Sequence, residues 1–396
     1  MLGGMLAGAD SIEDLDVLRA GATPVLLDRV PAPSTIGSWL PSFTLGNVRQ
    51  LDAVSREVRT RLWADGAGPH QLGGRLFIDV DSTIAAAYGP AKQGVSFGDT
   101  KVRGYHPLVA AVTEPGNTPD VLHTRLREGR ANTARGAASF VAESLSRARA
   151  AGACGELVVR ADGGFYNHAV VGACTRAGAR FSVAVRADRK VRAAIEAIDE
   201  DAWTPIPYWS SHVDPDTGQV IDSHADVAET TYTAFAATKH PVTARLVVRR
   251  VRRLRPRTGQ LQLAVDLWRH HPILTDRVEP LLTAQAEHRQ HAIVEQVIAD
   301  LKNSALAHLP SGSFNANAAW LALAALAHNI TRALATLAGF DLGAATTATI
   351  RRTLIAIPAR LVRSARRLRL RMPKHWPWAR PYDWAIRRIL AIPMRT

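Results

Sequence analysis

Acidic residues far apart in the sequence stand where a metal-dependent enzyme would need them. The stretch LFIDVDST (76–83) is typical of a buried strand, and it carries Asp79 and Asp81 on one face because residues i and i+2 of a strand point the same way. Asp162 follows the apolar run ELVVRA, and Glu295 lies in a stretch with helical spacing. Buried carboxylates are costly without a compensating charge, and carboxylate oxygens are the ligands that Mg²⁺ and Mn²⁺ prefer. We therefore expect Asp81, Asp162 and Glu295 to hold two such ions.

A pair of metal ions suits the cleavage of a phosphodiester, because the ions can stabilise both the attacking and the leaving oxygen. Asp79 shares a face with Asp81, so either could be the ligand on the first strand; the family resemblance given below implies Asp81, with Asp79 supporting it or lying at the rim. Asp162 could instead serve a turn before its two glycines. Glu295 could instead be a solvated helix residue paired with a nearby base.

A polar stripe surrounds Glu295. His288, His291, Glu295 and Lys302 lie at offsets of 0, 3, 7 and 14, which one continuous α-helix would place on one face. Val294, Val297, Ile298 and Leu301 supply an apolar side for packing against a sheet. The stripe is then free to meet the phosphates of a substrate.

The surrounding elements predict an α/β fold in which a mixed sheet is flanked by helices. Short β runs (RLFIDVD, GVSFGDT, KVRGYHPLVAAVT) precede a helix, a strand, a second helix and a further strand, which is the order of a ribonuclease H-like core. The expected organisation has five parts: a helical N-terminal region (1–74), the first part of the core (75–186), a β-rich insertion between the second Asp and the Glu (187–272), a helical part carrying the Glu (273–340) and a basic tail (341–396).

The distribution of charge points to a polyanionic partner. The chain carries a formal net charge of +14, and residues 351–396 contain 13 Lys or Arg and one acid. We expect Arg366 and Arg367 in this tail to contact DNA, with an anionic membrane surface as the weaker alternative. The run RLVVRRVRRLRPR (245–257) has seven Arg and no acid, so Arg250 and Arg253 are expected to bind DNA as well.

Several protein classes are disfavoured. Two cysteines rule out a disulfide framework and a cysteine-rich zinc site, and they favour a reducing cytoplasm. The apolar stretch from Ala316 is interrupted by His328, Asn329 and Arg332, which leaves a clean run below the ~18 residues of a membrane span and predicts a buried core helix. No cationic, cleavable leader opens the chain, which argues against secretion. DNA, and no membrane, is the expected partner.

Eight blocks carry a resemblance to a known family. They are FIDVDSTIAAAYGPAKQG, KVRGYHPLVA, RLREGRANTARGAASF, RADGGFYNHAVV, DVAETTYTAF, HRQHAIVEQVIADLK, HLPSGSFNANAAWLALAALAHNITR and RLVRSARRLRLRMPKHWPW. In this order and spacing they resemble the DDE transposases of the insertion-sequence family numbered 1380. The resemblance covers nearly the whole chain. It implies a ribonuclease H-like fold, two Mg²⁺ or Mn²⁺ ions, and a catalytic triad of Asp81, Asp162 and Glu295.

The resemblance also implies partners and marks two departures. The partners are duplex DNA, as the terminal inverted repeats and the target, and a second copy of the chain, because two ends must be joined. Wider relatives carry Tyr and Arg where this chain has His288 and His291, so the phosphate contacts of these two positions are in question and Arg289 is a candidate to compensate. The chain also opens at what resembles an internal point of the family, which suggests a truncated N-terminal region.

The function expected is therefore metal-dependent cleavage of transposon ends followed by strand transfer into target DNA in the bacterial cytoplasm, at the nucleoid. One alternative is a non-catalytic DNA-binding remnant or repressor, which would bind end DNA without nicking it. Another is a nuclease or resolvase with the same acids, whose products would contain no joined strands. The fold alone does not separate these possibilities.

Overall fold

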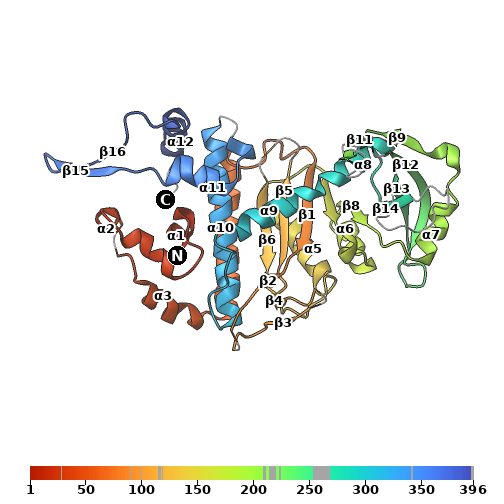
Figure 1. Cartoon of the computed structure of the whole chain (residues 1–396), viewed down its shortest axis with the longest axis horizontal. Coiled ribbons are helices and arrows are strands. Elements are labelled where there is room, and N and C mark those ends of the chain that lie inside the picture. The colour runs from red at the N-terminus through yellow and green to blue at the C-terminus, as the bar shows by residue number, and fades with distance from the viewer. Residues whose placement is uncertain are drawn as a thin grey trace. The chain divides into compact units, whose positions relative to one another are not determined.

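A computed structural model describes most of the chain. The described residues are 1–27, 29–89, 91–98, 100–114, 117, 119–207, 211–213, 220–222, 224–252, 268–339 and 342–393. They form two compact units, whose elements are labelled in Figure 1. Unit 1 comprises Met1–Arg135, Phe140–Leu157 and Ile293–Thr396, and unit 2 comprises Gly136–Ser139 and Val158–Ala292.

The N-terminal part of unit 1 is helical. Its elements are α1 (Leu2–Ala7), η1 (Glu13–Arg19), α2 (Thr23–Leu26), α3 (Pro33–Trp39), η2 (Leu40–Ser42) and α4 (Leu45–Ala64). Helix α4 begins with a capping box, because the Thr44 hydroxyl accepts the N–H of Asn47 at 3.3 Å and Asn47 Oδ1 accepts the N–H of Thr44 at 2.9 Å. Near its end, the Trp63 indole donates a 2.7 Å hydrogen bond to the buried carboxylate of Asp120, which ties this helix to the sheet.

The sheet of unit 1 has the order β6-β5-β1, and its pairs are antiparallel. Its strands are β1 (Leu76–Ser82), β5 (Leu108–Thr113) and β6 (Asp120–Arg125), and a small second sheet contains β2 (Ala85–Ala86), β3 (Ser96–Phe97) and β4 (Arg103–Tyr105). Three strands of the main sheet thus precede the helix α5 (Ala137–Ala150), but they do not coincide with the three runs predicted. GVSFGDT supplies only the short β3, and KVRGYHPLVAAVT is divided at Pro107, which lacks an N–H to donate. The third strand is β6, whose Asp120 and His123 obscure its β pattern although both are buried.

Two helices near the C-terminal side supply much of the core of unit 1. Helix α9 (Ile293–Lys302) packs on β1 and β5 and buries the four apolar residues predicted for that role. Helix α10 (Phe314–Ala338) is long and apolar enough to span a membrane, but 83% of its apolar window is buried, which confirms the expected core helix. The Asn329 side chain of α10 bonds both backbone groups of Val121 in β6, at 2.8 Å each. These bonds satisfy the buried backbone of Val121, which lies beside the shift in register between β5 and β6.

The C-terminal segment continues unit 1. It contains η6 (Leu342–Ala344), α11 (Thr347–Ile350), the π-helical turn η7 (Arg351–Ile355), the hairpin strands β15 (Arg360–Ser364) and β16 (Arg367–Arg371), and α12 (Ala379–Ala391). Asp300 of α9 accepts hydrogen bonds from the N–H and the hydroxyl of Thr347, so α11 is attached to α9. The tail that the sequence predicts as basic is therefore folded in part as a hairpin and a helix.

Unit 2 contains a mixed sheet of order β7-β8-β14-β13-β12-β9. Its elements are β7 (Leu157–Ala161, from Val158 on), η3 (Gly163–Phe165), α6 (His168–Arg176), β8 (Arg180–Ala184), α7 (Arg189–Glu196), η4 (Glu200–Ala202), β9 (Thr204–Ile206), β12 (Ala225–Ala234), β13 (Val242–Arg252), β14 (Trp268–Thr275), α8 (Leu281–Arg289), η5 (Gln290–Ala292) and the separate pair β10 (Ser211–Val213) and β11 (Val220–Asp222). Strands β7 and β8 are parallel, and the other pairs are antiparallel. The structure is therefore mixed α/β, as predicted, and compatible with a ribonuclease H-like fold.

Candidate active site

The first predicted acids lie on β1, in different surroundings. Asp79 is fully buried, and its Oδ2 accepts a 2.8 Å hydrogen bond from the Thr113 hydroxyl of β5. Asp81 is half-buried near the end of the strand, and its Oδ1 accepts the N–H of Ser82 at 2.6 Å. A half-buried carboxylate at a strand end can reach a ligand, whereas a fully buried one braces the sheet. This difference favours Asp81 over Asp79 as the ligand.

The packing of α9 on β1 brings a basic residue to Asp81. Burial lowers the pKa of the Lys302 ammonium below its ordinary value, and the Asp81 carboxylate opposes this shift. The two side chains therefore interact electrostatically, although they are 221 positions apart in the sequence. Glu295, on the first turn of the same helix, is exposed and forms no hydrogen bond or ion pair with the part of the chain that the structure describes. Its carboxylate oxygens are available to a ligand.

Asp162 belongs to unit 2, where it follows β7 and caps the short helix η3. Its Oδ1 accepts the N–H of Gly164 at 2.9 Å. The side chain is exposed, and no described residue bonds its second carboxylate oxygen. The turn role predicted as an alternative for this residue is thus present, and it occupies only one of the two oxygens. A turn residue can still offer the other oxygen to a cation.

The helix predicted to carry the polar stripe is not continuous. It ends as α8 at Arg289, passes through the 3₁₀ segment η5, and begins again as α9 at Ile293. The prediction of one straight face from His288 to Lys302 is therefore wrong, because a 3₁₀ segment turns by three residues instead of 3.6. Both histidines and Arg289 lie in unit 2 and are half-buried.

His288 has a role inside unit 2. Its Nδ1 lies 2.9 Å from the Ser182 hydroxyl on β8, and its ring is 6.3 Å from that of His291. The imidazole is thus oriented by the sheet. One ring nitrogen is therefore engaged within unit 2.

The donor chemistry of the three acids fits the predicted metal ions. All three offer carboxylate oxygens, which are the ligands that hard cations prefer. Their side chains are half-buried or exposed and so can be reached from solvent. Among the described residues, no group of three or more His, Cys, Asp or Glu side chains is gathered as a metal site. The roles of Asp81, Asp162 and Glu295 as ligands stay predictions.

Comparison with known proteins decides the family. The family described as transposase DDE domain, group 1, matches residues 2–394. The chain belongs to this transposase family. A comparison with curated proteins found no match. Membership indicates a transposase that acts on DNA, and enzymes of this kind normally use divalent metal ions. The narrower assignment to the insertion-sequence family numbered 1380 and the N-terminal truncation are not tested by this match.

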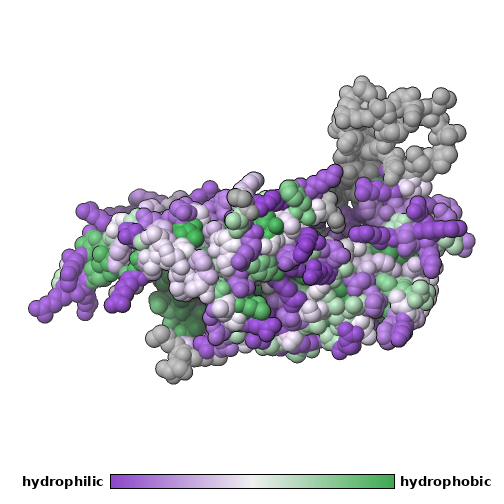
Figure 2. Space-filling view, turned by 90° about the horizontal axis from the view of Figure 1, so that it is seen from below, coloured by the Kyte–Doolittle hydropathy of each residue, from purple (hydrophilic) through white to green (hydrophobic). Residues whose placement is uncertain are grey.

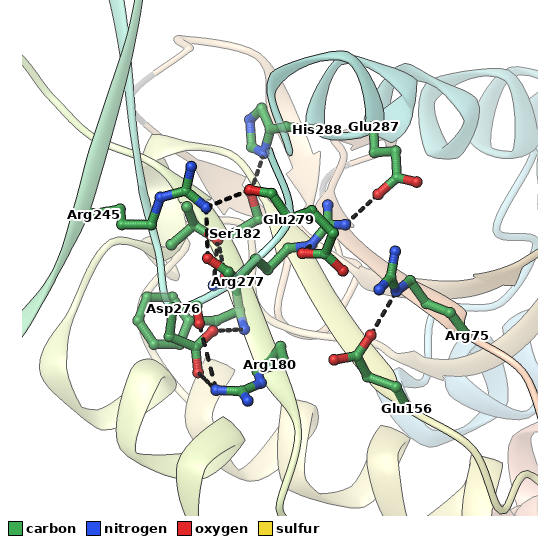
Figure 3. Close-up of polar contacts among 12 residues, drawn as sticks. Arg75, Glu156, Arg180, Ser182, Arg245, Asp276, Arg277, Glu279, Glu287 and His288 are labelled. Carbon is green, nitrogen blue, oxygen red and sulfur yellow. Dashed lines mark hydrogen bonds and ion pairs between the residues drawn. The ribbon is translucent and has the colours of Figure 1, made fainter. Parts of the chain in front are cut away.

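An ion-pair cluster that the sequence did not predict holds α8 in place in this transposase. Arg277, which is fully buried after β14, forms ion pairs with Glu279 at 3.2 Å and with Glu287 of α8, as Figure 3 shows. Arg160 of β7 donates to the backbone carbonyl of Glu287, and Arg245 of β13 donates to the carbonyl of Glu279 at 2.8 Å. The cluster thus joins β7, β13 and the end of β14 to the helix that carries His288.

Arg250, predicted to bind DNA, is surrounded by partners within unit 2. Its guanidinium lies 4.3 Å from the ring centres of Trp203 and of Trp268, and it forms ion pairs with Asp226 at 2.8 Å and with Glu200 at 2.5 Å. The residue is only 8% exposed. A buried guanidinium with two carboxylate partners and two aromatic faces favours a structural role over phosphate contact. Arg253, also predicted to bind DNA, lies outside the described residues.

Sequence analysis also missed the residue that organises the loop beside Asp81. Arg127 donates to the carbonyls of His106 (2.9 Å), Asn132 (2.8 Å), Thr133 (3.2 Å) and Arg135 (2.9 Å). The Thr133 hydroxyl lies 3.4 Å from that of Ser82, the residue after Asp81. The guanidinium therefore holds the 132–135 loop against the end of β1.

The segment between Arg127 and the 132–135 loop approaches the small sheet so closely that glycine is required at position 129. A Cβ at Gly129 would lie 2.1 Å from the Gly104 carbonyl oxygen and 2.4 Å from that of Ser96. The only signal in the sequence is the REGRANTARG pattern itself, in which the buried arginine is not distinguishable from the two exposed ones.

Proposed function

We propose that this protein is a DNA transposase whose catalytic triad is Asp81, Asp162 and Glu295. The observation that carries the proposal is the match of residues 2–394 to the transposase DDE domain. The packing of α9 on β1 supports it, because this packing places Lys302 beside Asp81 within unit 1. In the proposal, Asp162 of unit 2 completes the set.

The proposed reaction is hydrolysis of a phosphodiester at each transposon end, followed by attack of the freed 3′-hydroxyl on target DNA. Asp81, Asp162 and Glu295 would hold two Mg²⁺ or Mn²⁺ ions, which supply charge stabilisation for the phosphoryl transfer when bound. The Lys302 ammonium would steady a phosphate oxygen of the scissile strand. The side chains of His291 and Arg289 are candidates for contacts to the flanking phosphates. The 132–135 loop would hold the end of β1 in position.

The proposed substrate is duplex DNA bearing terminal inverted repeats of the insertion-sequence family numbered 1380. Two ends have to be cut and joined together, so we propose that two copies of the chain act in one complex. Such a protein works on the nucleoid in the bacterial cytoplasm. The basic C-terminal segment, with Arg366 and Arg367, would supply contacts to the phosphate backbone.

The test is cleavage of a supercoiled plasmid that carries the element ends. We expect the parent to nick it with Mg²⁺ or Mn²⁺, and Asp81→Asn, Asp162→Asn and Glu295→Gln each to lose at least about 100-fold in rate while still binding DNA. Glu57→Gln is the matched control, since Glu57 is an exposed acid of α4 whose partner among the described residues is Arg61.

The outcomes separate the possible functions. A parent that binds end DNA without nicking under either metal is a non-catalytic binding protein or repressor. A parent that nicks but never produces joined strands is a nuclease or resolvase. Full activity in Asp81→Asn or Glu295→Gln refutes the proposed triad.

A further inference from the structure

A two-stranded ribbon within the C-terminal segment separates its side chains by chemical type. Strands β15 and β16 pair antiparallel, from Arg360 opposite Arg371 to Ser364 opposite Arg367. The loop between them has two residues, Ala365 and Arg366, with φ of 48° and 62°. Positive φ at both positions is the geometry of the hairpin turns that match the right-handed twist of strands. Figure 1 shows this hairpin extending beyond the helices of unit 1.

The register assigns four arginines to one face of the hairpin. Residues directly opposite each other in an antiparallel pair share a face, and every second residue of a strand lies on that same face. The arginine face therefore contains Arg360, Val362, Ser364, Arg367, Arg369 and Arg371, and the opposite face contains Leu361, Arg363, Leu368 and Leu370.

Both faces of β16 are exposed to solvent. All five of its residues are exposed, and Leu368 and Leu370 retain 50% and 52% of their accessible surface. Within the described part of the chain, no acidic side chain forms an ion pair with the arginines of the hairpin. The acid of this segment, Asp383, is paired with Arg387 of α12 at 2.9 Å. In Figure 2, hydrophilic side chains cover the projecting end of the molecule at the left, with hydrophobic ones beside them.

Charge and dimensions favour one partner. Arginines at alternate positions of a strand are about 6.6–6.8 Å apart, and the two strands of a ribbon are separated by about 4.8 Å. The major groove of B-DNA is about 12 Å wide and admits a two-stranded ribbon. An array of unpaired guanidinium groups on such a ribbon complements the phosphates that line the groove.

We propose that the β15–β16 hairpin docks along the major groove of duplex DNA through its arginine face. This inference rests on the proposed function. It adds which element of the chain binds DNA, which face of that element contacts the DNA and which groove of the duplex it occupies. Arg367, Arg369 and Arg371 contact the DNA backbone, and the leucine face points away from it.

The test is the salt dependence of binding to a duplex of element-end sequence between 50 and 200 mM NaCl. Each lost phosphate contact lowers the slope of log K against log salt by about 0.9, so the Arg367→Gln/Arg369→Gln/Arg371→Gln variant loses about 2.7. Over this fourfold change in salt, the affinity of the parent then falls about 40-fold more than that of the variant. The single variants Arg369→Gln and Arg363→Gln form a matched pair, because they remove one exposed arginine from opposite faces of the same hairpin. Only Arg369→Gln is expected to change the slope.

A chemical probe tests the groove. Methylation of guanine N7 modifies the major groove, and methylation of adenine N3 modifies the minor groove. We expect interference from guanine N7 in the parent and its loss in the triple variant. Interference confined to adenine N3, or equal slopes for Arg369→Gln and Arg363→Gln, would overturn the proposal.

Further measurements keep this result separate from the proposed function. If the triple variant loses binding to vesicles of anionic lipid but binds DNA as the parent does, the inference is also overturned. If the parent nicks the plasmid and the triple variant keeps the parental salt slope, the DNA-binding role of the hairpin is refuted. The transposase proposal then stands. A parent that neither binds nor nicks DNA refutes both. An unchanged urea midpoint shows that the variants are folded.

Discussion

The loop beside Asp81 should lose its position when Arg127 is replaced. The Arg127 guanidinium joins His106 at the entrance to β5 to the carbonyls of the 132–135 loop, and the residue is 8% exposed. Hydrogen bonds to charged groups contribute about 1.5–3 kcal/mol each. Three of the four are shorter than 3 Å, but the loop carbonyls lie near solvent and regain water when the side chain is removed. The expected net loss for Arg127→Met is therefore about 2–4 kcal/mol.

Trypsin gives a measurement of this loop that does not depend on activity. Arg130 and Arg135 are exposed, so trypsin will cleave after them once the loop detaches. We expect rapid cleavage at both sites in Arg127→Met and partial protection in Arg127→Lys, because an ammonium lacks the planar fork that reaches several carbonyls. Cleavage of element-end DNA should fall about 10- to 100-fold in Arg127→Met, since the loop lies beside the residue that follows Asp81.

The control for Arg127 is Glu128→Gln, which removes only an ion pair with Arg130 at 3.2 Å. A largely exposed pair of this kind contributes about 1 kcal/mol or less. The urea midpoint and the trypsin pattern of this variant should match those of the parent. If Arg127→Met also melts like the parent and its loop stays protected from trypsin, the four hydrogen bonds do not hold the loop and the reasoning fails.

Other residues give sharper tests of individual contacts. Asn329→Leu should lower the free energy of unfolding by about 1–3 kcal/mol in urea, because it leaves the buried N–H of Val121 unsatisfied, while the carbonyl keeps a 3.3 Å hydrogen bond from Arg59; a loss below about 1 kcal/mol would contradict this. Burial lowers the pKa of His123 to about 4, so the histidine favours the folded state above pH 6.5 and this contribution is lost as the pH falls from 6.5 to 4. Unfolding of His123→Gln should therefore depend less on pH in that window, and an unchanged profile argues against a neutral buried imidazole. Arg250→Ala should destabilise unit 2 by about 2–4 kcal/mol and leave the salt slope of DNA binding unchanged, whereas a slope reduced by about 0.9 would restore its predicted phosphate contact.

Periodic patterns in the sequence predicted many elements well. The helices α4, α5 and α6 and the strands β1, β7 and β8 lie where apolar spacing, caps and glycines place them. The same signals failed at β6, whose Asp120 and His123 are buried because α4 and α5 supply polar partners. A pattern based on apolar alternation cannot anticipate a partner that is 57 residues away, as Trp63 is from Asp120.

For the candidate site, too, the sequence indicated some features and not others. Asp81, Asp162 and Glu295 are predicted site residues on the basis of their type, position and family resemblance. In the structure, each lies at a strand end or on a helix with at least part of its side chain exposed. The 3₁₀ break at Gln290 was not predictable, because no proline or glycine marks it. Nor did the arginine content of the chain distinguish Arg250, held between two tryptophans, from the exposed arginines of the β15–β16 hairpin.

The amino-acid sequence by itself determined the family, the mixed α/β class and the acidic residues offered for catalysis, because these depend on residue types and on spacings within single elements. The tertiary structure decided which charged groups are available. Arg127, Arg250 and Arg277 resemble the other arginines of a basic chain, yet their guanidinium groups are fixed by carbonyls or carboxylates supplied by other segments. A charged side chain acquires its role from the groups that replace its water, and folding alone brings those groups together.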